Sequence, residues 1–206
     1  MIMRYGAAAL LLASALSSLK GQSSRPVESP DITAAAVLRA DSSHDWRMLL
    51  ALAHPEALLE FRRDQVRSLQ FKDFSAFPGA SACFAQQMDK RNRLLLDSVF
   101  RVPNVDSLAR MAPESVFARE QRPWANLRMP VDSFTPKRTV VGYVIADDST
   151  AYVIVEDRYN RRPLPDWPER RPQIMTFRRY RGTWRSMLDP DIGHGSGWMM
   201  ESSECR

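Results

Sequence analysis

The sequence predicts an α+β domain in which helices come first and an antiparallel sheet comes last. In the first two thirds, apolar residues recur at intervals of three and four, which is the spacing of one helix face. The last third instead carries segments rich in β-branched and aromatic residues, separated by short turn sequences. Strands joined this closely form an antiparallel meander, against which the preceding helices pack. We therefore expect four strands, at residues 139–146, 151–159, 173–180 and 183–188.

The first 30 residues are expected to lie outside that domain. Arg4 precedes a run of Ala and Leu, and Ala13-Ser14-Ala15 fits a small-residue cleavage site, as in a secretory signal peptide. A buried N-terminal helix is the alternative. We expect an exported protein, periplasmic or extracellular, with a cleaved signal at residues 1–22, a Ser/Pro linker at 23–30, the domain at 31–190 and a flexible tail at 191–206.

The helical part begins near residue 31 and is interrupted twice. Trp46, Leu49 and Leu50 fall on one helical face, which we expect to be buried against the sheet. His54 precedes Pro55, a residue favoured in the first turn, so a new helix starts there with His54 as its cap. Further helices are expected at residues 84–99, 106–111 and 113–120, followed by an irregular segment at 121–136 that contains three prolines.

Two features resemble a known family. Asp45-Trp46 is followed by His54-Pro55-Glu56, and the late meander ends in Gly182-Thr183-Trp184-Arg185. Together they resemble the nuclear-transport-factor-2-like (SnoaL-like) superfamily, in particular its small exported members of unknown function. The resemblance covers residues 31–189. It implies a cone-like fold, with N-terminal helices packed on the concave face of a bent antiparallel sheet around a pocket. The long segment at 160–172 departs from the family pattern.

The resemblance also implies where a ligand would bind. The candidates for the pocket are Trp46, His54, Tyr143 and Tyr152, although a core, capping or rim role is open for each of them. The family includes isomerases, dehydratases and hydrolases, but no acid–base pair can be assigned here, and Asp157 is expected to pair with an arginine. We therefore expect a non-catalytic module that binds a small ligand or a partner. The alternative is a small isomerase, dehydratase or hydrolase acting on an apolar substrate.

Arginine dominates the cations, with 25 Arg and 4 Lys in a chain of net charge +5. Nine arginines lie between residues 158 and 185, and the prolines at 160–172 predict a projecting loop. A solvated surface is one interpretation, and contact with an anionic envelope surface is the other. The candidates for that contact are Arg161, Arg162, Trp167, Arg170 and Arg171. No nucleic-acid-binding module is recognised, so no nucleic acid partner is expected, whereas a homodimer is open.

Cysteine and histidine usage gives little indication of a metal site or cofactor. The two cysteines, Cys83 and Cys205, could form one disulfide in an exported protein or remain separate thiols. The three histidines show no pairing at helical spacing and no Cys-x-x-Cys occurs, so neither a metal nor a cofactor is expected.

Overall fold

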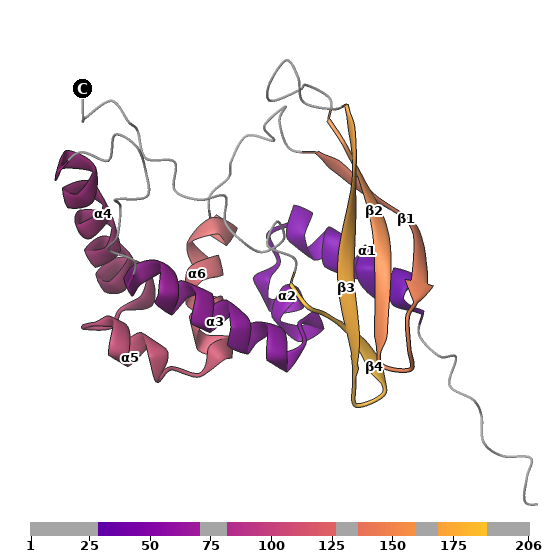
Figure 1. Ribbon diagram of the computed structural model, residues 1–206, viewed down its shortest axis with the longest axis horizontal. Helices are drawn as coiled ribbons and strands as arrows, with labels where there is room; N and C mark the ends of the chain where they lie inside the picture. Colours follow the sequence, from indigo (N-terminus) through magenta and orange to yellow (C-terminus); the bar gives the residue numbers. More distant parts are fainter. Residues whose placement is uncertain (1–28, 71–81, 127–135, 160–168, 189–206) are drawn as a thin grey trace, which may run out of the picture.

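The computed structural model describes residues 29–70, 82–126, 136–159 and 169–188, so the expected signal, the expected tail and linker residues 23–28 lie outside the described residues. The last residue of the expected linker, Pro30, instead begins the first helix. Within them the chain is α+β, as predicted, with a curled sheet of four antiparallel strands (Figure 1). The helical elements are α1 (Pro30–Ser42), α2 (Trp46–Leu52), α3 (Pro55–Gln70), α4 (Ala82–Leu94), the π-helical turn η1 (Leu95–Phe100), α5 (Val105–Ala109) and α6 (Pro113–Asn126).

The helices start where local capping chemistry places them. The Asp45 carboxylate accepts a hydrogen bond from the Met48 backbone N–H at 3.1 Å, which fixes the start of α2. The break before it contains His44 at φ 53°, a left-handed turn that ends α1. At the next break the His54 ring nitrogen Nδ1 accepts from the Glu56 N–H at 3.2 Å, as the sequence predicts for the cap of α3.

The expectation of an irregular segment from residue 121 was wrong for residues 121–126, which belong to helix α6. The helix continues to Asn126 with Pro123 inside it. Pro123 lies in the last turn, so the missing N–H removes a single helical hydrogen bond near an end that would leave carbonyls unpaired anyway. The preceding turn is held from outside, because Arg119 donates to the Phe100 carbonyl and Gln121 is buried.

The four strands lie in the order in which they occur along the chain. They are β1 (Lys137–Ile145), β2 (Thr150–Arg158), β3 (Arg170–Tyr180) and β4 (Thr183–Ser186), each paired antiparallel with the next. Strand β3 begins earlier than predicted and includes Pro172, which the sequence analysis placed in a loop. Strand β4 pairs only with Phe177–Tyr180, so the part of β3 that contains Pro172 lies at the edge of the sheet. A residue without an N–H is tolerated at such an edge.

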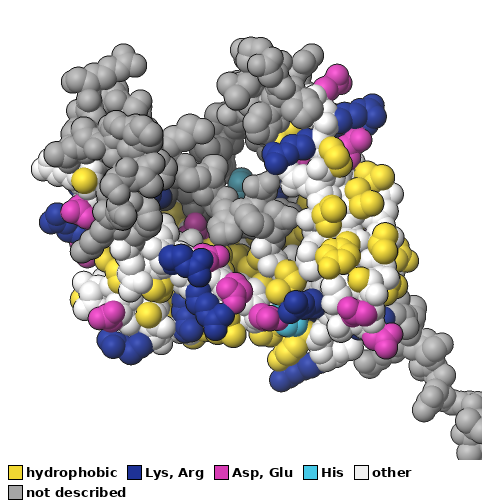
Figure 2. All heavy atoms as spheres, viewed as in Figure 1, with side chains coloured by type: hydrophobic (Ala, Val, Ile, Leu, Met, Phe, Trp, Pro, Cys, Tyr) yellow, Lys and Arg dark blue, Asp and Glu magenta, His cyan; other side chains and the backbone are white. Residues whose placement is uncertain are grey.

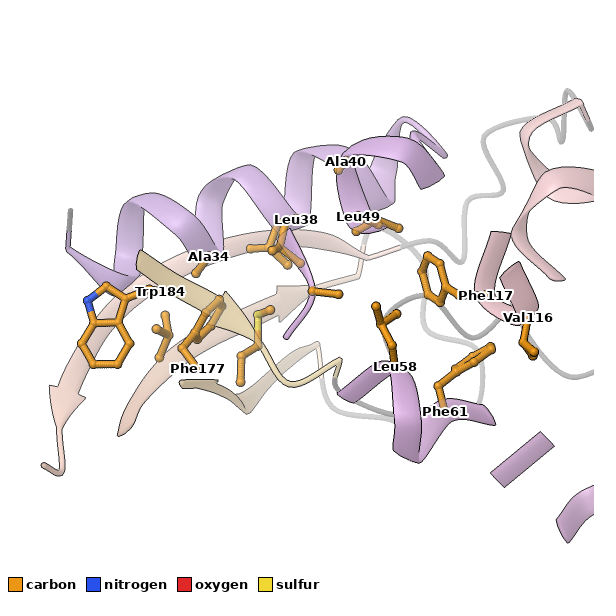
Figure 3. Close-up of a cluster of buried hydrophobic side chains, with 14 of the residues drawn as sticks. Ala34, Leu38, Ala40, Leu49, Leu58, Phe61, Val116, Phe117, Phe177 and Trp184 are labelled. Carbon is orange, nitrogen blue, oxygen red and sulfur yellow. The ribbon is translucent and has the colours of Figure 1, made fainter. Parts of the chain in front are cut away.

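One face of the sheet is covered and forms the core with the helices. Helix α1 lies against β1, β2 and β4. Ala34 and Leu38 of α1 face Phe177 of β3 and Trp184 of β4 across this core (Figure 3). The core continues through Leu49 of α2 into the helices α3, α5 and α6. The buried sheet residues of this covered face are Ala151, Val153, Val155, Asp157, Met175, Phe177, Trp184 and Ser186.

Candidate functional site

The four predicted pocket residues do not converge on one site. Trp46 is half-buried at the start of α2, where the Arg122 guanidinium of α6 lies 5.8 Å from its ring centroid. His54 lies past the far end of the same helix. In the sheet register Tyr143 is opposite Val153, a residue of the covered face, whereas Tyr152 is opposite Val144, which is exposed. The two tyrosines therefore point to opposite faces of the sheet.

Asp157 forms an ion pair with an arginine, as expected from the sequence. Its carboxylate is 1% exposed and lies 3.2 Å from Nε of Arg138 on the neighbouring strand. Arg138 also binds Asp41 of α1 at 2.9 Å, and Gln173 donates to Asp157 at 2.9 Å. A buried carboxylate held by a guanidinium and an amide secures α1 to the sheet, so we assign Asp157 a structural role and not that of a proton carrier.

The predicted anionic-surface residues are described only in part. Arg161, Arg162 and Trp167 lie outside the described residues, as do the side chains of Cys83 and Cys205. Arg170 and Arg171 belong to β3 and point to opposite faces, because Arg170 pairs in register with Arg158 and Arg171 with the buried Asp157. These two arginines therefore do not form one patch.

A candidate site that was not predicted from the sequence is the face of the sheet opposite α1, called here the uncovered face. Two rows cross it in register: Gly142, Ile154 and Ile174, then Val144, Tyr152 and Thr176. Ile174 is 61% exposed and Tyr152 is 42% exposed. Figure 2 shows these strands from this side, with hydrophobic side chains gathered over them. Val141, the extra residue between Val140 and Gly142, forms a bulge in β1 and is 64% exposed.

The sequence did contain a signal for this face. The strand segments are apolar at consecutive positions, as in Val140-Val141 and Val153-Ile154-Val155, without the alternation of a sheet that is solvated on one side. Such runs are typical of strands that are buried on both faces. Within the described residues only one face is covered, so the other carries apolar side chains without a layer above them.

Charged side chains border the two apolar rows. Lys137, Arg158 and Arg170 form one row in register at one end, where Glu156 lies 3.3 Å from Arg158. At the other end of β1, the turn to β2 carries Asp147 and Asp148. Hydrogen bonds from Ser149, at 2.7 Å and 2.8 Å, lower the pKa of Asp147, so this turn is acidic at neutral pH.

A polar cluster lies where β3 and β4 meet the start of α3. The His54 N–H donates to the Ser186 carbonyl at 2.8 Å, and Ala53 forms a parallel bridge with Ser186. The Tyr180 ring meets the His54 ring edge-on at 5.6 Å between centroids. Glu56 of α3 forms a salt bridge with Arg178 of β3. This cluster connects the helical part to the edge of the sheet.

The described residues hold no group of three or more His, Cys, Asp or Glu side chains placed to bind a metal ion. None of the described helices is both long and apolar enough to cross a membrane. No family model matches the chain, and comparison with curated proteins and with solved structures finds no significant match.

Proposed function

We propose that this protein is an exported, non-catalytic interaction module whose binding surface is the uncovered face of the sheet. The observation that carries the proposal is the pair of apolar rows on β1, β2 and β3. Isolated exposed hydrophobic residues are ordinary, whereas a contiguous patch with a charged border is typical of a protein–protein contact.

The size of the patch fits such a contact. The exposed parts of Val144, Tyr152, Ile154 and Ile174 amount to roughly 400 Å², taking about 200 Å² for each large side chain as an order of magnitude. A standard interface buries about 800 Å² on each partner, of which somewhat more than half is apolar. The uncovered face thus supplies about the apolar area of a standard interface.

The partner we propose is a second copy of the chain, packed sheet to sheet. Two sheets pack well through apolar faces with their strands nearly aligned. A twofold axis perpendicular to the strands would place the row of Lys137 and Arg158 over the acidic turn at Asp147 and Asp148 of the other copy. Opposite charges would then meet at the ends of β1 in both halves of the contact.

Sedimentation velocity over a wide range of concentration tests this function. Ile174→Asp places a carboxylate in the apolar rows, and we expect it to convert the dimer to monomer. Ile32→Asp is the matched control, because Ile32 is 58% exposed on α1 and Ile174 is 61% exposed on β3. A monomeric wild-type chain at every concentration would contradict the dimer. An Ile174→Asp chain that dimerises like the wild type would exclude the uncovered face.

Two further parts of the proposal concern the scaffold and the export. The position of α1 against β1, β2 and β4 of a curled sheet supports a nuclear-transport-factor-2-like cone with helices on its concave face. A small apolar molecule or an anionic envelope surface would be a further ligand of such a module.

Export predicts a mature chain that starts between residues 16 and 24. N-terminal sequencing of envelope material tests this start, and an intact Met1 would contradict export.

A further inference from the structure

The contact between the helical part and the edge of β4 depends on a histidine ring that acts as a hydrogen-bond acceptor. His54 Nδ1 accepts from the Glu56 N–H, and an imidazole nitrogen can accept only while it carries no proton. The backbone N–H of the same residue donates to Ser186 of β4. The His54 side chain therefore caps α3, while the His54 backbone N–H supplies the hydrogen bond beside the Ala53–Ser186 bridge.

The groups around the ring favour its neutral form. Arg178 of β3 and Arg185 of β4 both lie close enough to repel a charged imidazole, and Glu56 of α3 attracts it. Tyr180 of β3 contributes the edge-on ring contact. Glu56 also forms a salt bridge with Arg178, which weakens the attraction between the Glu56 carboxylate and a charged His54 ring. Burial and the two arginines prevail over Glu56 and lower the pKa of His54 below its ordinary value of 6.5.

We propose that the contact of Ala53 and His54 with Ser186 is an acid-sensitive connection that loosens when His54 takes up a proton. The charged ring loses its hydrogen bond from the Glu56 N–H and becomes a third cation beside Arg178 and Arg185. The start of α3 then separates from the edge of β4 and leaves the Ser186 carbonyl without its backbone partner. This inference is independent of the proposed function of the uncovered face.

The sign of the effect follows from the direction of the pKa shift. His54 binds a proton more weakly in the closed contact than in the open one. The contact is therefore strongest above pH 6.5 and weakens as the pH falls below it, until the lowered pKa of the closed form is passed. Within that window one proton changes the closing equilibrium by up to tenfold per pH unit.

Hydrogen exchange of the His54 backbone amide in the full chain measures this equilibrium. Exchange rates are normalised to the intrinsic rate at each pH, because amide exchange itself depends on pH. We expect the protection of this amide to fall by up to tenfold per pH unit below pH 6.5. The ring titration of His54, followed by NMR, is expected to give a pKa below 6.5. Unchanged protection across this range, or a ring pKa of 6.5 or more, would overturn the proposal.

Two histidine variants separate this connection from other titrations. His54→Asn keeps a side-chain oxygen that can accept from the Glu56 N–H but takes up no proton, so its amide protection should not change with pH. His44→Asn is the matched control, because His44 is exposed at φ 53°, a conformation that Asn tolerates, and it should behave like the wild type. Survival of the pH dependence in His54→Asn would overturn the proposal, as would its loss in His44→Asn.

Glu56→Gln supplies a test that does not change the histidine. It removes the carboxylate that favours the charged ring, so the ring pKa of His54 should move further below its wild-type value. A ring pKa that stays the same or rises in this variant would overturn the assignment of the groups around His54.

Discussion

Replacing Glu120 by glutamine should stabilise the protein at neutral and alkaline pH. Glu120 lies in α6, and burial raises the pKa of its carboxyl from 4.5 to about 7, although a side-chain hydrogen bond from Gln121 acts in the opposite direction. A carboxyl that is harder to ionise in the folded protein than in the unfolded chain makes folding less favourable once the solution is alkaline enough to ionise it.

The shift in pKa sets the size of the effect. The difference between 4.5 and about 7 corresponds to about 3 kcal/mol, at 1.36 kcal/mol for each pKa unit. Below pH 4.5 the carboxyl is neutral in both states, and the wild type has its full free energy of unfolding. As the pH rises from 4.5 toward 7 the wild type loses this contribution of about 3 kcal/mol, and it remains lost above pH 7. Glu120→Gln should therefore match the wild type near pH 4.5 and exceed it by up to about 3 kcal/mol at pH 8.

Urea denaturation at several pH values measures the free energy of unfolding for both chains. Glu114→Gln is a suitable control in the same helix, because Glu114 is exposed, and it should change stability by less than about 1 kcal/mol. A Glu120→Gln chain that is no more stable than the wild type at pH 8 would refute the predicted cost of ionising Glu120. A stability difference that is the same at pH 4.5 and pH 8 would also refute it, because it could not come from ionisation.

Two further predictions concern the core. Arg138→Ala removes the Arg138 guanidinium from the buried Asp157 carboxylate and should cost about 3–5 kcal/mol, whereas Arg170→Ala, at an exposed pair, should cost less than about 1 kcal/mol. Equal effects in denaturation would show that Asp157 does not depend on Arg138. Phe117→Ala removes a buried ring that meets Phe61 edge-on at 5.2 Å and should cost about 3–5 kcal/mol. An unchanged denaturation midpoint would place this ring outside the core.

The secondary structure could be predicted from the sequence where local chemistry decides it. The helix break at His54-Pro55 and the short turn between the first two strands were both predicted in this way. Pro172 was misjudged because its effect depends on whether a strand is paired at that residue. Strand β4 is short enough to leave that position at an edge, and this depends on the assembled sheet and not on the local sequence.

The directions of the strand side chains could not be predicted in the same way. Val141 is an extra residue in β1, and a shift by one residue moves every following side chain to the other face. The placement of Tyr143 and Tyr152 on opposite faces depends on that register. The uncovered face was missed for a related reason, since consecutive apolar residues predict burial on both faces but do not reveal what provides the second cover.

Hydroxyl-radical footprinting of Tyr152 and Tyr143 at increasing protein concentration tests directly whether the uncovered face is the binding surface. The two rings are almost equally exposed, at 42% and 43%, but Tyr152 lies on the uncovered face and Tyr143 on the other. If the uncovered face is the binding surface, the labelling of Tyr152 should fall as the chain associates, while the labelling of Tyr143 stays constant. Constant labelling of both residues as the chain associates, or protection of Tyr143 alone, would contradict the account.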